Sequence, residues 1–262
     1  MIGEMAWERV DLSAAELDLP IAVGGSTAPH RLLEAHRHGA FPYPRLRDHP
    51  AEAHRALYAH HVADGRITAF PAAQSDDAYA VTWWSPARRP VIKVGATLLP
   101  GILRHSPNRG PRWIVTCDHA FASVVNGCRD QAHSTWITDS FRASLITLHE
   151  AGWAHSVEIW QGENLIAGLF GTGIGNVFSV DSAFSRRPYG TRVAFADLSR
   201  RLRGQADLID VQVPHDYTAA LGTRSISREE YLNALLTVDM PLAMRAGVLS
   251  VQPLSHGSPI TN

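Results

Sequence analysis

The hydrophobic pattern after residue 96 predicts helices separated by strands. Phe141, Leu145 and Leu148 recur at the spacing of one helical face, which predicts a helix over 138–151. Two more helices are expected, one over 192–202 and one from the S-x-x-E capping box that opens at Ser227 as far as Leu236.

Runs of β-branched and aromatic residues between these helices predict strands. Residues 157–160 and 165–170 flank a polar Gly-Glu-Asn turn, so we expect them to form a hairpin. Further strands are expected over 112–116, 177–180 and 208–213. Because strands and helices mix throughout this part of the chain, the pattern predicts an α/β (α+β) layer architecture.

The first 95 residues have a weaker pattern, rich in proline, histidine and alanine. Short helices are expected over 30–37 and 51–65, each ended by a glycine. Residues 45–80 carry few large apolar side chains, and we interpret them as an insertion or lid. The predicted organisation is an N-terminal domain over 1–95, with an inserted segment near 45–80, and a second domain over 96–262.

The composition excludes several classes of protein. With 45% apolar and 19% charged residues, the chain is globular and not disordered. Its 24 basic and 25 acidic residues give a net charge of −1, which argues against a surface that binds nucleic acid everywhere. Its 2 cysteines lack a CxxC spacing and its 14 histidines lack an H-E-x-x-H pattern, so neither a disulfide framework nor a metal site is expected.

The chain carries no recognisable signal for export or membrane insertion. The segment MIGEMAWERVDLSAAELDLP has acids where a signal peptide has a basic region and an apolar run. No stretch of 18 consecutive apolar residues occurs. We therefore expect a cytoplasmic protein without a membrane partner. A monomer is expected as well, although no sequence pattern determines the oligomeric state.

Asp210 and Gln212 are the first candidates for chemistry. In a strand over 208–213 both side chains would share one face, about 7 Å apart, and could hold a polar group between them. The alternative is the solvent-facing side of an edge strand. Asp181 follows an apolar run, and it either adds a second carboxylate to the same cleft or serves as a turn residue.

The arginines of residues 186–203 form the second candidate site. Six arginines against one acid, Asp197, give this stretch a local charge of +5, which suits phosphate binding. A solvated helix face is the alternative. The arginines are Arg186, Arg187, Arg192, Arg200, Arg201 and Arg203.

Tryptophans and glycines supply two further motifs. Trp83 and Trp136 could stack on nucleic-acid bases or pack in the core. Gly171, Gly173 and Gly175 depart from the dinucleotide-binding pattern because an asparagine follows where a third glycine is required. We interpret them as bulge or tight-packing glycines.

Several motifs occur together in a distinctive order. They are RLLEAHRHGAFPYP (31–44), WWSP (83–86), NGC (126–128), TWIT (135–138), LHEAGWAHSVEIW (148–160), LIAGLFGTGIGNVFSVDSAFSR (165–186), LIDVQV (208–213), LG (221–222) and YL (231–232). Together they resemble the leucyl/phenylalanyl-tRNA–protein transferase family, bacterial enzymes that move an amino acid from aminoacyl-tRNA to a protein N-terminus. The resemblance covers nearly the whole chain except 45–80.

The resemblance implies a small N-terminal domain and a GNAT-like acyltransferase domain, with no metal, coenzyme A, other cofactor or covalent enzyme intermediate. It implies that Trp83 and Trp136 stack on the terminal adenosine of the tRNA. It also implies that Asp210 and Gln212 form the catalytic pair, with Asp181 in place of the family's glutamate. The implied pocket for the transferred side chain consists of Leu169, Phe178 and Ala183.

An aminoacyl ester is already activated toward attack by an amine. The enzyme must add orientation, which can supply ~7–11 kcal/mol, and must help to remove a proton from the amine. We expect Asp210 to accept or stabilise that proton, Gln212 to orient the amine or the carbonyl, and the arginine patch to hold acceptor-stem phosphates.

Departures from the family pattern cluster near the acceptor side of the site. Asp181 is one methylene shorter than the family's glutamate, and Ala183 replaces a methionine in the side-chain pocket. His215 and Tyr217 replace an asparagine and a histidine, the basic stretch near 100–110 is reduced, and residues 45–80 are added.

These departures lead us to favour a tRNA-dependent aminoacyltransferase with an unusual acceptor. It would move an amino acid, Leu or else Phe or Met, from aminoacyl-tRNA to a small amine-bearing molecule of a biosynthetic or self-resistance pathway. The alternative is the family activity, in which Leu or Phe is added to N-terminal Arg or Lys of proteins and marks them for degradation. A tRNA-binding module without catalysis is a third hypothesis, disfavoured because both Asp210 and Gln212 are present.

Overall fold

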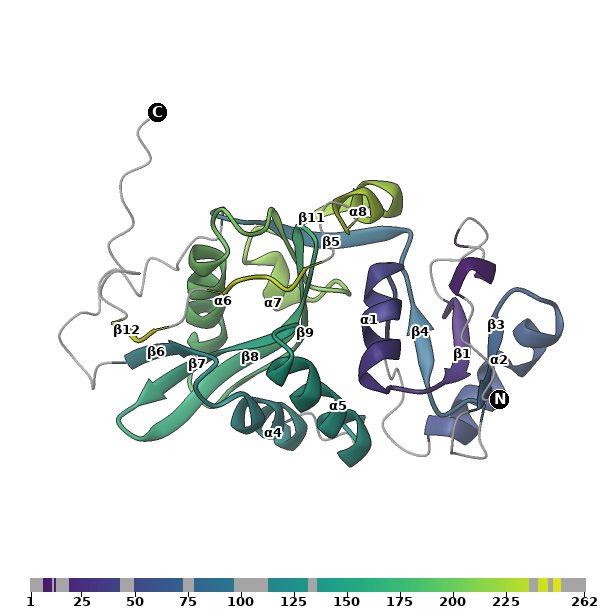
Figure 1. Cartoon of the computed structure of the whole chain (residues 1–262), viewed down its shortest axis with the longest axis horizontal. Coiled ribbons are helices and arrows are strands. Elements are labelled where there is room, and N and C mark those ends of the chain that lie inside the picture. The colour runs from purple at the N-terminus through teal and green to yellow at the C-terminus, as the bar shows by residue number, and fades with distance from the viewer. Residues whose placement is uncertain are drawn as a thin grey trace.

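The computed structural model contains two β-sheets with helices packed against them (Figure 1). The structure describes residues 7–10, 12, 19–42, 50–72, 78–96, 113–131, 136–235, 240–244 and 247–250. The smaller sheet lies at one end of an elongated molecule, and the larger sheet occupies the other end. The mixed α/β architecture that the sequence predicts is confirmed.

The N-terminal unit is built around the smaller sheet, in the strand order β2-β4-β1-β3. Its elements are β1 (Ala22–Gly25), α1 (Pro29–Arg37), β2 (Phe41–Pro42), α2 (Pro50–Ala63), β3 (Thr68–Ala72) and β4 (Thr82–Trp84). The two helices predicted here are confirmed, whereas the four short strands were not predicted because they hold few residues and little alternation.

The segment interpreted as an insertion or lid contributes to this small sheet. β3 pairs in parallel with β1, so that Ala22 lies opposite Thr68. Tyr58 of α2 packs edge-on against Trp84 of β4, with ring centroids 6.4 Å apart. The described part of 45–80 is therefore a structural layer of the N-terminal unit. Its status as an insertion relative to the family stays a prediction.

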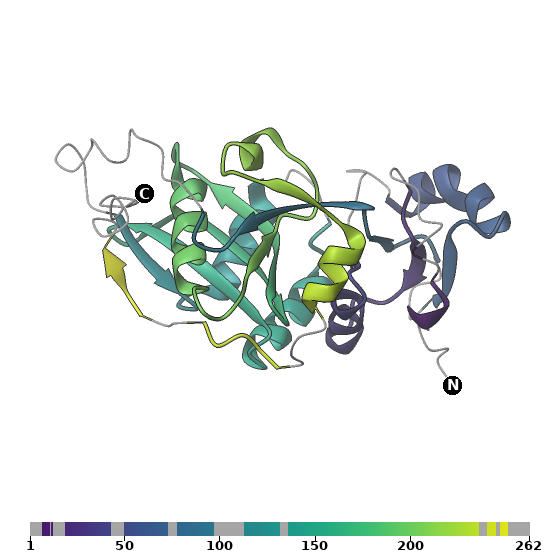
Figure 2. The ribbon, with the colours of Figure 1, turned by 90° about the horizontal axis from the view of Figure 1, so that it is seen from above.

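The C-terminal unit is built around the larger sheet, in the order β11-β5-β10-β9-β8-β7-β6-β12. Its elements are β5 (Arg88–Lys93), β6 (Trp113–Cys117), α4 (Phe121–Gln131), α5 (Asp139–Glu150), β7 (Ala154–Gln161), β8 (Asn164–Ile174), β9 (Val177–Ser185), α6 (Gly190–Arg201), β10 (Leu208–Asp210), α7 (Asp216–Ala219), β11 (Arg224–Ser227), α8 (Arg228–Leu235) and β12 (Leu249–Ser250). Figure 2 shows β12 at the end opposite the small sheet.

The boundary between the two sheets lies earlier than the predicted boundary at residue 95. β4 belongs to the small sheet, but β5, only a few residues later, is a strand of the large sheet between β11 and β10. Charged residues at both ends and an internal Pro90 conceal this strand in the sequence. The chain therefore changes sheets between Trp84 and Arg88.

Most elements of the large sheet agree with the sequence pattern. The helix over 138–151 is α5, in which Thr138 accepts a hydrogen bond from the amide of Phe141. The hairpin is β7–β8, the strands over 112–116 and 177–180 correspond to β6 and to the first part of a longer β9, and 192–202 is α6. The last helix begins after Ser227, whose hydroxyl accepts from the amide of Glu230 at 3.0 Å, and ends at Leu235. Helix α4 was not predicted.

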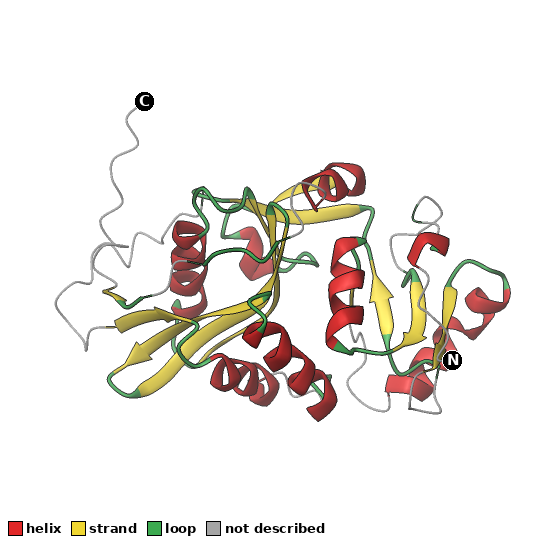
Figure 3. Cartoon of the chain, viewed as in Figure 1, coloured by secondary structure: helices red, strands yellow, loops and turns green. Residues whose placement is uncertain are grey.

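Helices cover both faces of the large sheet (Figure 3). Leu169 and Phe170 are neighbours on β8 and therefore point to opposite faces. Leu169 belongs to the apolar cluster of α6, with Phe195, while Phe170 belongs to the cluster of α1, α4 and α5, with Leu145. This division places the polar residues described below on the face that α1 covers.

The glycines of β8 confirm the interpretation as tight-packing residues. A Cβ on Gly171 would lie 2.1 Å from the backbone oxygen of Ser179, at the point where the register of β8 and β9 shifts. A Cβ on Gly173 would lie 2.6 Å from a side-chain carbon of Leu242. Gly175 adopts a φ of 55° in the turn between the two strands.

Candidate active site

The centre of the candidate site is a buried ion pair between Arg89 and Asp210. Arg89 belongs to β5, and Asp210 is the last residue of the neighbouring strand β10. Nε of the guanidinium donates to both carboxylate oxygens at 3.0 Å, and a terminal nitrogen donates to Oδ2 at 2.7 Å. Arg89 is 1% exposed and Asp210 has no exposed surface, so the interpretation as a solvent-facing edge strand is wrong.

Two hydroxyls and one backbone carbonyl make further hydrogen bonds with this ion pair. Oδ2 of Asp210 accepts from the hydroxyls of Ser179 at 3.0 Å and Tyr231 at 2.9 Å, and Arg89 donates to the carbonyl of Gly39 at 3.2 Å. Burial alone would lower the pKa of Arg89, but the adjacent carboxylate raises it above its usual value, so the guanidinium stays charged. Every polar contact of this carboxylate is with the protein, which favours a positioning role for Asp210. Its expected role in accepting or stabilising the amine proton stays a prediction.

Gln212 lies beside the ion pair, although not through strand alternation. β10 ends at Asp210, and Gln212 has a left-handed backbone with a φ of 61°, so the predicted strand over 208–213 is too long. Oδ1 of Asp210 accepts from the Gln212 backbone amide at 2.8 Å. The side-chain Nε2 donates to Asp181 Oδ1 at 2.9 Å and to Ser179 Oγ at 3.2 Å. No described group donates to Gln212 Oε1, which leaves this carbonyl able to accept a bond from a substrate.

Asp181 is the carboxylate best placed to transfer a proton. Phe170 pairs with Ser182 and Gly171 with Val180, which leaves Asp181 as the extra residue of a β-bulge. Its side chain is 6% exposed. Burial raises the pKa of Asp181 to about 7, against the opposing effect of its hydrogen bonds. A carboxylate that is half ionised near neutral pH suits general acid–base chemistry.

His36 is a site residue that the sequence interpretation missed. It lies in the last turn of α1, is 5% exposed, and places Nε2 3.9 Å from Asp181 Oδ1. Burial lowers the pKa of His36 to about 4, and the nearby Arg89 adds to the shift. The available signal was its place within RLLEAHRHGAFPYP, but the sequence did not show which of the two histidines in that stretch is buried.

The two tryptophans have different environments. Trp83 has no exposed surface, contacts Trp7 edge-on at 5.4 Å and donates its indole hydrogen to the carbonyl of Gly24 at 2.9 Å. A ring without an exposed face cannot stack on a base, so the core interpretation holds for Trp83 and the stacking prediction is wrong. Trp136 is partly buried against Phe141, and its contact with adenosine stays a prediction.

The structure brings together the residues expected to form the side-chain pocket. Leu169 lies directly opposite Ala183 in the β8–β9 pair, and both belong to one apolar cluster with Phe178. Leu169 and Phe178 are fully buried, and Ala183 is partly exposed. Because Leu169 points toward α6, this cluster lies on the sheet face opposite Ser179 and Asp210. Its role as a substrate pocket stays a prediction.

The six arginines of 186–203 do not form one patch. Arg201 is 1% exposed and pairs with the buried Asp197 at 2.5 Å, and Arg200 pairs with the other oxygen of Asp197 at 2.8 Å. The hypothesis of phosphate binding is thereby weakened for these two. Arg203 is exposed beyond the far end of α6, away from the arginines that precede and begin the helix.

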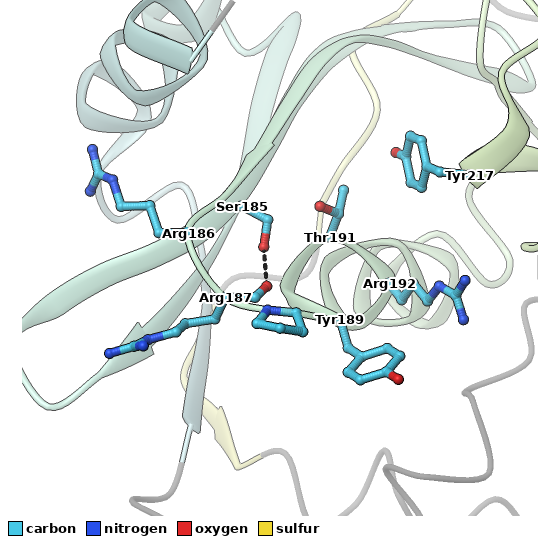
Figure 4. Close-up of a pocket in the computed structure, with 8 residues that line it drawn as sticks. Ser185, Arg186, Arg187, Tyr189, Thr191, Arg192 and Tyr217 are labelled. Carbon is cyan, nitrogen blue, oxygen red and sulfur yellow. Dashed lines mark hydrogen bonds between the residues drawn. The ribbon is translucent and has the colours of Figure 1, made fainter.

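The remaining arginines line an open pocket of about 480 Å³ at the start of α6. Figure 4 shows Arg187 and Arg192 extending to opposite sides of Tyr189. The guanidinium of Arg192 lies over the ring of Tyr189 at 5.6 Å. The pocket is lined by Ser185, Arg186, Arg187, Pro188, Tyr189, Thr191, Arg192 and Tyr217.

Other potential chemistry is limited in the described residues. Within these ranges no three His, Cys, Asp or Glu side chains gather in a way that could hold a metal ion. Cys117 and Cys128 are buried free thiols, and burial raises the pKa of Cys128 to about 12, which makes it unreactive. Among the described helices, none combines the length and apolar character needed to span a membrane.

The fold and the site together define a class of enzyme. A carboxylate of near-neutral pKa lies beside a fixed amide carbonyl, and an exposed arginine-lined pocket lies along the same strand, β9. This combination suits acyl transfer to an amine from a donor that carries phosphate.

Comparison with known proteins gives the family. The model of the family described as leucyl/phenylalanyl-tRNA protein transferase matches residues 91–236. Leucyl/phenylalanyl-tRNA–protein transferase of Proteus mirabilis is 34% identical over 216 residues, covering 82% of this chain and 80% of the relative. The enzyme of Stutzerimonas stutzeri is 34% identical over 253 residues, covering 91% and 97%. The chain therefore belongs to this family of aminoacyl-tRNA-dependent aminoacyltransferases.

The buried ion pair generates a prediction about stability. Asp210→Asn and Arg89→Met each leave one charge buried without its partner, which should lower the free energy of unfolding by about 3–5 kcal/mol. The double variant leaves neither charge and should lose clearly less than the sum. Urea unfolding of the four proteins measures this cycle, and strictly additive losses would contradict the pairing.

Proposed function

We propose that this protein transfers leucine or phenylalanine from aminoacyl-tRNA to the α-amine of a protein N-terminus, with Arg or Lys as the expected first residue. The support is that the relatives matched over most of the chain carry the name of a protein transferase. The comparisons favour this alternative over the small-molecule acceptor that the departures near Asp181 suggested. A cytoplasmic location and action as a monomer are part of the proposal.

The observation that carries the chemistry is the contact between Asp181 and Gln212. The amine arrives as an ammonium, and Asp181 accepts one proton from it. The neutral nitrogen then attacks the ester carbonyl while Gln212 Oε1 holds one of its N–H groups. A C–N bond forms, the bond from the carbonyl carbon to the 3′ oxygen of the tRNA breaks, and the second proton lost by the nitrogen ends on that oxygen.

The ion pair contributes to this reaction through positioning. Asp210 fixes Gln212 through its backbone amide and fixes Ser179, which in turn accepts from Gln212 Nε2. Both amide hydrogens of Gln212 are thereby engaged, so Oε1 is held in one direction. Such preorganisation supplies the orientation that the reaction requires.

The tRNA contact belongs to the pocket at the start of α6. Ser185 is four residues from Asp181 along β9, a span of about 13 Å at ~3.3 Å per residue. Phosphates of the single-stranded 3′ end would therefore reach Arg186, Arg187 and Arg192 while the ester lies near Asp181. Trp136 remains the expected contact for the terminal adenosine. Leu169 and Phe178 are fully buried on the sheet face opposite Ser179 and Asp210, and Ala183 is partly exposed, so the predicted side-chain pocket carries no step of this proposal.

An acceptor assay tests the function directly. Leucyl-tRNA is offered with an Arg-initiated peptide, with the same peptide acetylated at its α-amine as control, and with a set of small free amines. We expect leucylation of the free peptide only. Rapid leucylation of a small amine and none of the peptide would restore the small-molecule hypothesis, and no transfer to any acceptor would reject both.

The raised pKa of Asp181 predicts the pH dependence of transfer. Only the ionised carboxylate can accept the amine proton, so kcat/KM should rise with pH and reach half its plateau near pH 7. Asp181→Asn should remove this limb and lower kcat/KM about 10²–10⁴-fold, whereas Asp181→Glu should keep both the limb and activity. A limb near pH 7 that persists in Asp181→Asn would contradict the assignment.

The raised pKa of Asp181 also lowers the free energy of unfolding at neutral and higher pH. Its folded pKa is raised, so its contribution is favourable below pH 3.8, the unfolded value, and is lost as the pH rises through 7. Asp181→Asn should therefore be more stable than the wild type at pH 8, by on the order of 2–4 kcal/mol, and not at pH 4. Urea unfolding at the two pH values measures the difference.

The proposed phosphate contacts predict that only arginines of the pocket affect the binding of tRNA. Arg187→Ala and Arg192→Ala should each raise KM for leucyl-tRNA about 3–10-fold and reduce the slope of log KM against log salt by roughly 0.7–1. The matched control is Arg66→Ala, an exposed arginine after α2 in the N-terminal unit. Equal effects from all three variants would show that the pocket has no special role.

A further inference from the structure

His36 reaches the catalytic face of the large sheet from the N-terminal unit. It occupies the last turn of α1, a helix that contacts β8 and α5. Leu32 and Ala35 of the same helix are buried in the cluster that also holds Phe170 of β8. The imidazole is thus held by packing from both units and is not a side chain on a mobile surface.

The ring is buried yet makes no hydrogen bond with any described residue. Its closest polar contact is Asp181 Oδ1, 3.9 Å from Nε2, which is beyond hydrogen-bonding distance. Gln212 Nε2 donates to the same oxygen at 2.9 Å. The imidazole and the Gln212 amide therefore lie within 4 Å of one carboxylate atom, and both keep an acceptor that nothing in the described structure uses.

Residual exposure distinguishes these three side chains from the ion pair beneath them. The His36 side chain is 5% exposed and that of Asp181 6%, and Gln212 as a whole residue is 6% exposed, whereas the Asp210 side chain has no exposed surface. A group of polar side chains that remain slightly open while their support is closed has the form expected of a binding site for a small polar group.

The charges around His36 keep its ring neutral. Asp181 of β9 lies 3.9 Å from Nε2, and Arg89 of β5 and Asp210 of β10, which neutralise one another, also act on the ring. Burial, with a further contribution from Arg89, lowers the pKa of His36 to about 4. A neutral imidazole offers one lone pair and does not repel an incoming cation.

We propose that His36 binds the acceptor's α-amine, as the third hydrogen-bond acceptor beside Asp181 and Gln212 Oε1; this inference rests on the proposed function. A primary ammonium has three N–H groups, and the three acceptors match them. When Asp181 takes its proton, the N–H bonds to His36 and to Gln212 Oε1 hold the neutral nitrogen in place. Its lone pair then lies on the side from which Asp181 removed the proton, and the ester carbonyl must approach from that side. His36 itself gains and loses no proton.

The test compares two substitutions with two acceptors. His36→Phe keeps the packing volume but removes the acceptor atom, and His36→Gln restores a hydrogen-bond acceptor. We expect His36→Phe to lower kcat/KM for an Arg-initiated peptide about 10-fold, with KM for leucyl-tRNA changed less than about 2-fold, and His36→Gln to recover most of the loss. Unchanged thermal unfolding in both variants excludes a packing defect as the cause.

An N-methylated acceptor supplies a measurement that a purely structural residue would not alter. N-methylation of the peptide's α-amine removes one N–H donor. The wild type should discriminate against the methylated peptide, and His36→Phe should lose about 10-fold of that discrimination, because the acceptor for that hydrogen is already gone. Equal discrimination by both proteins would overturn the proposal, even where the wild type transfers leucine normally.

Peptide binding without tRNA separates this inference from the proposed function. By calorimetry, the wild type should bind the Arg-initiated peptide more tightly than His36→Phe by about 10-fold. This difference tests His36 even if no transfer is observed with leucyl-tRNA, which would reject the proposed function alone. Identical affinities, or no binding by either protein, would reject the role of His36.

Discussion

The ion pair between Arg89 and Asp210 holds together the elements that surround Gln212 and Ser179. Arg89 lies over the rings of Phe41 from β2 and Tyr231 from α8, and it donates to the carbonyl that follows α1 at Gly39. One guanidinium thereby ties the N-terminal unit, the large sheet and the last helix to one carboxylate. A planar donor with five N–H groups can make these contacts at once, which a lysine could not.

The different roles proposed for Asp210 and Asp181 follow from their burial and their hydrogen bonds. Asp210 is closed off and fully bonded, so its charge is stabilised and its chemistry is suppressed. Asp181, placed by a bulge at the edge of the same network, has few partners, and burial pushes its pKa toward neutrality. In the proposed mechanism Asp210, which the family pattern marks as catalytic, acts through Gln212. The shorter carboxylate at 181 keeps its contact with the site because Gln212 donates to it directly.

Sequence periodicity was sufficient for the larger elements but not for the details of the site. The helix at 139–150 and the β7–β8 hairpin follow from local pattern because each has a cap or a turn that fixes its ends. The end of β10 depends instead on a hydrogen bond between the Asp210 side chain and the Gln212 amide, which alternation cannot anticipate. The environments of Trp83 and His36 could not be predicted for a similar reason. Segments distant in the sequence bury these rings, and that burial decides whether a ring packs in the core, contacts a ligand or belongs to the polar site.

The positions of the arginines show how much of the local positive charge is available to a phosphate. Arg200 and Arg201 together neutralise one buried aspartate, so the +5 of residues 186–203 overstates what a phosphate encounters. The arginines that open onto the pocket at the start of α6 can hold only a few phosphates, and each contact makes binding salt-sensitive without making it sequence-specific. If tRNA is held at this pocket as proposed, the choice of acceptor must be made elsewhere. The amine site formed by Asp181, Gln212 and His36 is where an acceptor can be distinguished, since a buried site built to accept hydrogen bonds rejects any group that cannot donate them.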